Sequence, residues 1–333
     1  GYDTAMWGKW HVGDVYDEQL PHNQGFDYAE YSPYNGAVWG WQDSADYYEK
    51  HEVLPGRAPF WLDVPQDYFE RFGLEPHFIW EGRPGEKPTK VMPANCETYQ
   101  DMDTRRTNAI IKYVKDHAKS DKPFFIYFPS DATNSVCANN VKFRNLPHVD
   151  KANNLAVSLV EHDHNMGRLL ETLKETGIAE NTLVVWYSDN GPMHGFYPNT
   201  GYSHFRGGKG DVTEGGVRVP AIAWWPGMID PAQEPIDLLH VSDIYTTLAR
   251  IGGVKDNIPT DRVVDGIDQT VFLLKGEDHS RRDYIFHYSG TEIGAVRIGD
   301  LKMHYHGLAG GLPKFDLYNV KRDPREEVSS KIG

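Results

Sequence analysis

Cysteine and long apolar segments are both scarce in this sequence. Its 333 residues contain two cysteines, Cys96 and Cys137, which form neither a pair at metal-ligand spacing nor a disulfide framework. One disulfide bridge and none are equally compatible with the sequence. No run of about 18 apolar residues occurs, so we expect no transmembrane helix. The first residue is not methionine, and the sequence therefore offers no test for a signal peptide upstream.

Positive charge is scarce as well. The 34 Lys and Arg residues are outnumbered by 48 Asp and Glu residues, which gives a net charge of −14. Without a basic stripe to offset this charge, we expect no nucleic-acid partner. An anionic substrate stays compatible with the sequence if a few local cations and a metal ion outweigh the overall field. With 25% charged and 39% hydrophobic residues, the composition is that of a folded globular protein.

The pattern along the chain predicts an α/β fold. Residues 14–100 show little helical or strand period and favour long loops with short elements. Beyond them the pattern predicts helices over 98–119, 152–176 and 240–251, and buried strands over 123–128, 182–187 and 219–225. We expect a mainly parallel central sheet flanked by helices in a domain of residues 1–275. Four short alternating runs, at 284–287, 294–298, 301–305 and 315–318, predict a small antiparallel sheet in a C-terminal subdomain of residues 276–333.

Asp189 and Asn190 directly follow the predicted strand 182–187. Open α/β sheets bind ligands at the carboxyl ends of their strands. A carboxylate beside an amide oxygen is a pair of hard ligands suited to calcium or magnesium. The alternative is a plain turn, because the sequence from Ser188 to Gly191 is also good turn chemistry.

Lys9 and His11 lie two residues apart among glycines. Their side chains point to the same side if the segment is extended. A Lys cation about 4 Å from an anionic oxygen gains about 4 kcal/mol at an effective dielectric near 20. An imidazole can move a proton at neutral pH. The alternative is a glycine-rich loop with a surface lysine and a packed histidine.

A second lysine, Lys209, lies in a glycine-flanked loop that lets the backbone approach a ligand closely. His194, His204 and Arg206 precede it and are candidates for contacting the substrate. The nearby Glu214 and Arg218 favour a structural ion pair instead.

Four other histidines are expected to be structural. His162 and His164, with Asp163 between them, lie in the strongest predicted helix, where adjacent residues face different directions. His304 and His306 have the spacing of a strand but no carboxylate partner nearby in the sequence.

Taken together, the motifs resemble the formylglycine-dependent sulfatases of the alkaline-phosphatase superfamily. The resemblance rests on the order of three segments, residues 1–13, 187–191 and 207–220. It extends to Pro-His-Asn-Gln-Gly-Phe-Asp at 21–27, to residues 243–248, which are similar to the Asp-x-x-Pro-Thr-Leu helix with Thr246 replacing proline, and to the C-terminal Leu-Tyr-Asn stretch at 317–327.

By position, the resemblance implies that Asp189 and Asn190 are the second pair of calcium ligands, with magnesium the less favoured ion. Lys9, His11 and Lys209 would surround the nucleophile and the sulfate. In this family the nucleophile is a hydrated formylglycine, made from the cysteine of a Cys-x-Pro-x-Arg motif. Its diol attacks sulfur, the alcohol leaves and sulfate is released, with calcium acting as a Lewis acid.

This sequence departs from the family pattern at the nucleophile. Cys96 precedes Glu97-Thr98-Tyr99 and Cys137 precedes Ala138-Asn139-Asn140, and neither is the modification motif. The family carries its nucleophile before the first motif, so we expect this chain to be a truncated part that is inactive on its own. Ala132-Thr133-Asn134 also replaces the expected Ala-Pro-His. Two alternatives follow: the proton donor for the leaving group is lost, or His194 or His204 substitutes for it.

Three functions are compatible with these observations. The resemblance favours a sulfatase that converts a sulfate ester to an alcohol and inorganic sulfate. The alternatives are a non-catalytic remnant that serves as a binding protein, and a phosphonate or phosphate ester hydrolase of the same superfamily. The expected partner is a sulfated small molecule or carbohydrate, and the aromatic-rich segment 30–80 favours the carbohydrate. Membership of this family implies a periplasmic or secreted protein.

Overall fold

The computed structural model describes residues 1–33, 78–94, 96–132, 140–150, 153–194, 200–309 and 312–329. The chain divides into two compact units according to its internal contacts. The first unit consists of residues 1–178 with 195–201, and the second of residues 179–194 with 202–333.

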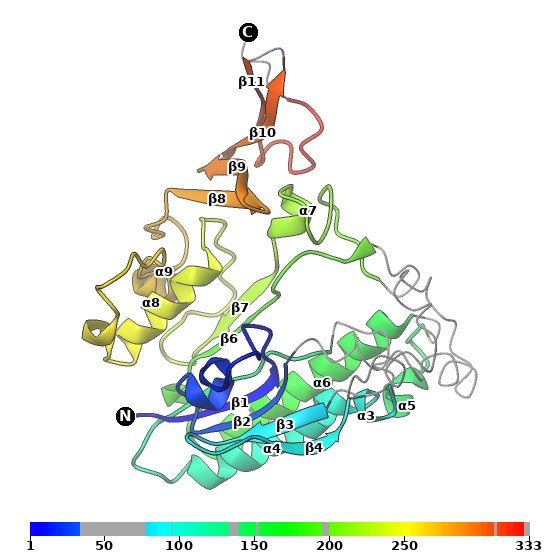
Figure 1. Ribbon diagram of the computed structural model, residues 1–333, viewed down its shortest axis with the longest axis vertical. Helices are drawn as coiled ribbons and strands as arrows, with labels where there is room; N and C mark the ends of the chain where they lie inside the picture. Colours follow the sequence, from blue (N-terminus) through cyan, green and yellow to red (C-terminus); the bar gives the residue numbers. More distant parts are fainter. Residues whose placement is uncertain are drawn as a thin grey trace. The chain divides into compact units, whose positions relative to one another are not determined.

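A five-stranded mixed sheet forms the centre of the first unit (Figure 1). Its order is β4-β3-β2-β1-β5, with β1 Asp3–Lys9, β2 Tyr28–Ser32, β3 Phe78–Gly82, β4 Thr89–Pro93 and β5 Phe124–Tyr127. The strand β1 pairs in parallel with both β2 and β5, whereas β2–β3 and β3–β4 are antiparallel. Ala5 and Met6 of β1 are fully buried, as expected for an inner strand of a covered sheet.

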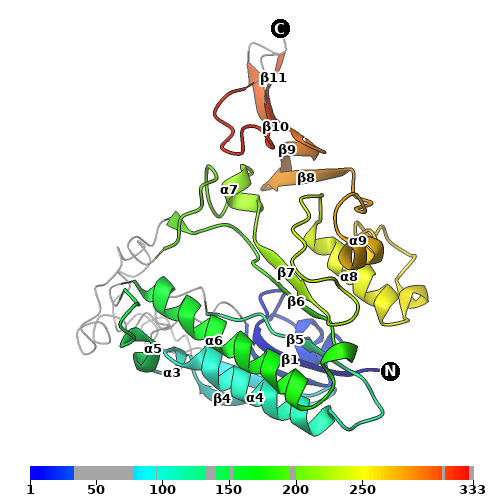
Figure 2. The ribbon, with the colours of Figure 1, turned by 180° about the vertical axis from the view of Figure 1, so that it is seen from behind.

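Two long helices of the first unit, α4 and α6, lie side by side along the sheet (Figure 2). Their bounds are α4 Met102–His117 and α6 Asn154–Glu175, and the shorter helical elements of the unit are η1 Asp17–Gln19, η2 Pro21–Asn23, α3 Cys96–Tyr99 and α5 Val141–Arg144. The side chain of Asn153 caps α6 by accepting from the backbone N–H of Ala156. Gly177, with φ 75°, ends the helix in the left-handed conformation that glycine favours, as the sequence predicts.

The second unit begins with a two-stranded antiparallel pair, β6 Val184–Tyr187 and β7 Ala221–Trp224. Its helical elements are η6 Ala179–Asn181, α7 Glu214–Val217, α8 Val241–Ile251, η8 Lys255–Asn257 and α9 Thr270–Lys275. Helix α8 begins with a capping box. The His240 side chain accepts from the backbone N–H of Ser242, and the Asp243 side chain accepts from the backbone N–H of His240.

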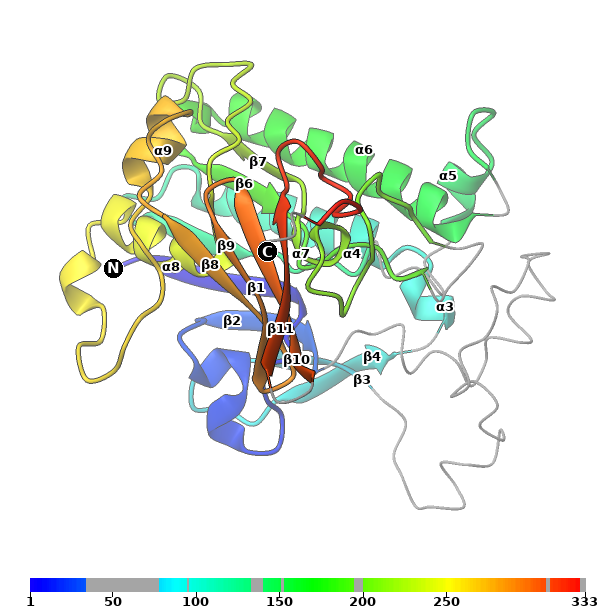
Figure 3. The same cartoon turned by 90° about the horizontal axis from the view of Figure 1, so that it is seen from above.

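A four-stranded antiparallel sheet of order β11-β10-β9-β8 completes the second unit (Figure 3). Its strands are β8 Tyr284–Ser289, β9 Glu292–Ile298, β10 Leu301–Ala309 and β11 Leu312–Asn319. Along β10, Lys302 and His304 are buried whereas Leu301, Met303 and Tyr305 are exposed. One face of the sheet therefore holds buried charged groups, and the opposite face presents apolar side chains.

The predicted fold class is confirmed, since a mixed central sheet with helices is joined by a small C-terminal antiparallel sheet. The parallel part is smaller than expected, because the predicted strands at 182–187 and 219–225 pair with each other in antiparallel fashion. The predicted helices and strands fall where the structure has them. The domain boundary at 275/276 stays a prediction. In the described part of the chain, every helix is too short or too polar to span a lipid bilayer.

Candidate active site

The Asp189–Asn190 pair lies in a tight loop at the carboxyl end of β6. The backbone N–H of Ser188 donates to Pro220 O (3.3 Å), and Ser188 Oγ donates to Asn190 O (3.0 Å). Asn190 Nδ2 donates to Gly191 O at 2.8 Å, which fixes the orientation of its amide. Asp189 is exposed. The loop thus presents a carboxylate and an amide oxygen, two hard donors, at the end of a strand.

The loop that carries Lys209 packs directly against this pair within the second unit. The backbone N–H of Lys209 donates to Pro192 O (2.9 Å), and that of Gly191 donates to Gly216 O (3.0 Å). A Cβ on Gly191 would lie 1.7 Å from Gly215 O, and one on Gly208 would lie 2.4 Å from Pro192 O. Only glycine permits this approach, so the glycines of the motif bring Lys209 and the Asp–Asn pair together.

The three candidate substrate ligands have different surroundings. His194 is exposed, and its ring stacks on Tyr202 with centroids 5.4 Å apart. Its Cε1 lies 3.3 Å from the position of a Cβ on Gly208, beside the Lys209 loop. His204 is also exposed, with its ring against Phe205. The guanidinium of Arg206 donates through Nη1 to the backbone oxygen of Glu326 (2.8 Å), a contact that sequence reasoning did not foresee.

Lys9 and His11 lie at the carboxyl end of β1 in the first unit. Backbone N–H groups tie this end to its neighbours, from Lys9 to Pro129 O (2.9 Å) and from His11 to Pro33 O (2.8 Å). The strand stops at Lys9, and His11 has φ 54°. The expectation that both side chains point to one side assumed an extended segment, and that assumption is wrong at His11. A left-handed residue reorients the chain, and non-glycine residues adopt it rarely outside special sites.

A buried arginine near this end was not foreseen from the sequence. Arg106 of α4 is 1% exposed; its Nη1 lies 2.5 Å from Asp131 and its Nε lies 3.8 Å from Glu30. Glu30 belongs to β2 and Asp131 to the segment after β5, so the arginine joins α4 to both. This ion pair is hard to predict from the sequence, because Arg106 and Asp131 are 25 residues apart.

Of the four histidines expected to be structural, three lie beside a carboxylate and His164 is exposed. His162 is buried with Nδ1 3.2 Å from Asp103, whereas Asp163 and His164 are exposed. His304 and His306 have carboxylate partners that lie 22 and 10 residues away in the sequence. His304 Nε2 lies 2.6 Å from Glu326, and His306 Nε2 lies 3.0 Å from Asp316.

The expected Glu214–Arg218 ion pair is present at 3.6 Å. Glu214 also bonds Arg297 and Lys302, each at 3.1 Å. The ion pair is therefore the outer part of a larger buried network, whose other members are more than 80 residues away in the sequence.

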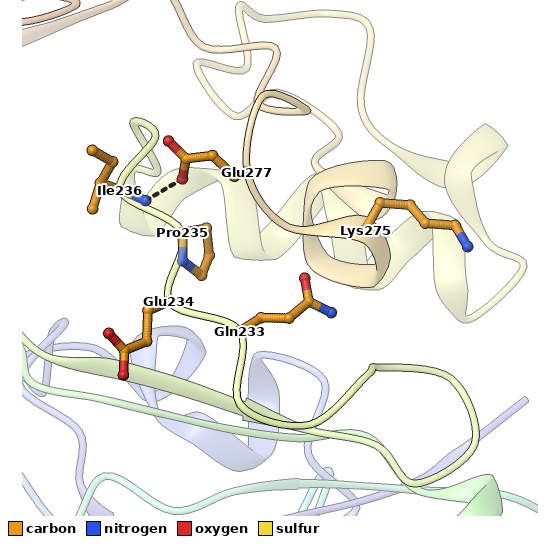
Figure 4. Close-up of a pocket in the computed structure, with 6 residues that line it drawn as sticks. All are labelled: Gln233, Glu234, Pro235, Ile236, Lys275 and Glu277. Atoms are coloured by element: carbon orange, nitrogen blue, oxygen red, sulfur yellow. Dashed lines mark hydrogen bonds between the residues drawn. The ribbon is translucent and has the colours of Figure 1, made fainter.

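A pocket of about 390 Å³ elsewhere in the second unit contains none of the predicted site residues (Figure 4). It is lined by Gln233, Glu234, Pro235, Ile236, Lys275 and Glu277. Next to the pocket lie three acidic residues, Asp237, Glu277 and Asp278. Two of them accept hydrogen bonds from the backbone of neighbouring loops. Asp237 accepts from the backbone N–H groups of His279 and Ser280, and Glu277 accepts from that of Ile236.

Several sequence-based expectations fall outside the described residues. They concern Thr133 and Asn134, Cys137, and most of the aromatic-rich segment 30–80. The side chain of Cys96 is likewise outside the description.

Comparisons with known proteins agree with one another. The sulfatase family model matches residues 1–254. N-acetylgalactosamine-6-sulfatase of Mus musculus is 29% identical over 313 residues, which is 91% of this chain and 52% of that protein. A sulfatase of Formosa agariphila is 30% identical over 366 residues, covering 99% of this chain and 63% of the relative.

A solved structure gives the same result in three dimensions. The PsFucS1 sulfatase from Pseudoalteromonas sp. aligns with a TM-score of 0.84 and 31% identity over 99% of this chain and 66% of that one. The chain spans about half the length of the first curated relatives that it matches. With a family model matched over most of its residues and a fold shared with a solved relative, this chain belongs to the sulfatase family.

Proposed function

We propose that the protein to which this chain belongs hydrolyses a sulfate ester to an alcohol and inorganic sulfate. The observation that carries the proposal is the contact between two motifs of the second unit, the backbone bond from Lys209 to Pro192 O at 2.9 Å. It holds the backbone of Lys209 against the segment that follows the Asp189–Asn190 pair, in agreement with membership of the sulfatase family.

In this proposal Lys209 and Lys9 neutralise the sulfate oxygens, whose charge persists throughout the reaction. His11 holds or releases a proton at the nucleophile. His194 and His204 contact the leaving alcohol and are the candidates for returning its proton. Arg206 belongs to the same candidate group, although its observed bond to Glu326 O supports the loop rather than an open subsite.

Asp189 and Asn190 fit a calcium ion, because they offer two hard oxygens and the Asn190 amide is oriented by its bond to Gly191 O. A bound calcium would polarise the sulfate oxygens. No residue of this chain fits the formylglycine precursor, because neither cysteine lies in a Cys-x-Pro-x-Arg motif. We therefore propose that the 333-residue chain alone does not turn over a sulfate ester.

The proposed substrate is a sulfated carbohydrate. Support comes from the similarity to N-acetylgalactosamine-6-sulfatase, whose name specifies a sulfated sugar. The proposal includes export from the cytoplasm, as the family resemblance implies.

Calcium titration of the 333-residue chain by calorimetry tests the site. Two ligands of a larger set should bind weakly, with a Kd of about 1 mM or higher. Asp189→Ala should abolish the heat of binding. Asp261→Ala, which removes an exposed carboxylate paired with Arg262, should leave it unchanged. Calcium binding that survives Asp189→Ala would sink the assignment, and turnover of an aryl sulfate by this chain would show that no formylglycine is required.

A further inference from the structure

Behind the Lys209 loop lies a group of buried charges. Glu214, Lys302 and Glu326 are each at most 1% exposed. Lys302 Nζ lies 3.1 Å from Glu214 Oε1 and 3.3 Å from Glu326 Oε1, and His304 Nε2 lies 2.6 Å from the same Glu326 oxygen. Buried ion pairs contribute little net stability compared with apolar packing, because desolvation offsets their attraction. Their presence therefore calls for a role beyond stability.

Glu326 occupies an unusual place in this group. It follows β11 in the C-terminal motif and has φ 53°, in the left-handed region. A non-glycine residue in that conformation costs about 1–2 kcal/mol, and it persists where the surroundings determine it. Glycine would adopt this backbone without strain, so the carboxylate itself is what the position requires.

The contacts of Glu326 show what that carboxylate holds. Its Oε2 accepts the backbone N–H of Glu214 at 2.7 Å. Its backbone oxygen accepts Arg206 Nη1 at 2.8 Å. Residues 206 and 214 are the two ends of the loop that carries Lys209, and the loop is closed by the backbone bond from Gly215 to Arg206 O at 2.8 Å.

The neighbouring Glu327 provides a direct contrast. It is exposed, and its side chain pairs with Arg325 at the surface at 2.8 Å. Two adjacent glutamates thus have the same chemistry, but only one of them reaches the loop.

We propose that Glu326 is a positioning residue that holds both ends of the 206–214 loop and so fixes Lys209 beside the Asp189–Asn190 pair. The value of this positioning for catalysis rests on the proposed function. The positioning itself rests only on the contacts above.

Amide hydrogen exchange of the 333-residue chain, followed by mass spectrometry of peptides spanning 207–213, tests the proposal. Glu326→Gln keeps the shape, but its single acceptor oxygen cannot serve both the Glu214 amide and the His304–Lys302 pair. Exchange in the loop should rise about tenfold or more while α8 keeps its rate. Glu327→Gln is the matched control and should leave both segments unchanged.

Arg206→Met gives a second test that does not depend on the folding of the buried variant. Arg206 is exposed, and the change removes only its bond to Glu326 O. The same loop peptides should exchange several-fold faster. Loop exchange at the native rate in Glu326→Gln and in Arg206→Met would overturn the proposal. An equal rise in α8 would also overturn it, because that result indicates general destabilisation. The calcium titration is independent, so the proposed function and the positioning role can fail separately.

Discussion

At the scale of single residues, the carboxylate of Asp243 is the clearest determinant of stability in the second unit. It is fully buried and accepts from Arg282 Nε (2.7 Å), from the backbone of Ile267 (2.8 Å) and from the backbone of His240 (2.9 Å). One side chain thereby joins the start of α8, the segment before α9 and the segment before β8.

We predict that Asp243→Ala lowers the free energy of unfolding by about 3–5 kcal/mol, because Arg282 is left buried without its counter-charge. Urea unfolding at pH 7 measures the effect. Asp261→Ala is the matched control, since Asp261 pairs with Arg262 at 2.9 Å on the surface; it should change stability by less than about 1 kcal/mol. Equal effects of the two variants would contradict the prediction.

At the scale of elements, glycines set the spacing between the loops of the site. We predict that Gly191→Ala lowers the free energy of unfolding by about 2 kcal/mol or more, because the new methyl group meets Gly215 O. Gly167→Ala in α6 is the opposite control: apart from the helix's own nearby backbone, no atom lies within 4 Å of its added Cβ, and alanine favours a helix by about 0.5–1 kcal/mol. Thermal unfolding of both variants tests this prediction. A Tm for Gly191→Ala equal to that of the wild type would disprove the close packing.

The elements themselves were largely predictable from the sequence, whereas their partners were not. The period of apolar residues located α4, α6 and α8, and alternation located β8 to β11. The antiparallel pairing of β6 with β7 was missed because a short apolar run has no direction. The one local signal was the absence of a long helical pattern between 188 and 220, which a parallel crossover needs. The motif residues of the site could be named, but Glu326, 120 residues from Arg206, could not.

At the scale of the whole molecule, buried carboxylates make stability depend on pH. Burial acts to raise the pKa of Asp103, Asp243 and Glu326, but their hydrogen bonds and cationic neighbours outweigh it and hold each pKa below its usual range. A lowered folded-state pKa contributes stability above the unfolded-state pKa of about 4, and this contribution is lost as the pH falls through the folded-state value. Glu161 acts in the opposite sense, because burial raises its pKa.

Burial also lowers the pKa of His22, His240 and His287, so below about pH 6.5 the unfolded chain binds protons that the folded chain does not. We therefore predict that the free energy of unfolding begins to fall below about pH 6.5 and falls further below about pH 4. Denaturant unfolding at several pH values measures this profile. The difference between the wild type and Asp243→Ala should shrink below about pH 4, since protonation removes the contribution that the variant lacks. A difference that stays constant down to about pH 2 would refute the role of this carboxylate.

The alternation along β10, with Lys302 and His304 inward and Leu301 and Met303 outward, has a consequence for how the C-terminal sheet finds its alignment. Displacing β10 by one residue would place Leu301 or Met303 against Glu214 and Glu326, and would remove Lys302 from both acids and His304 from Glu326. Misaligned pairings are thus penalised electrostatically rather than through lost apolar contacts. The folding fidelity of this sheet should accordingly be sensitive to charge-neutralising changes that leave its hydrophobicity intact.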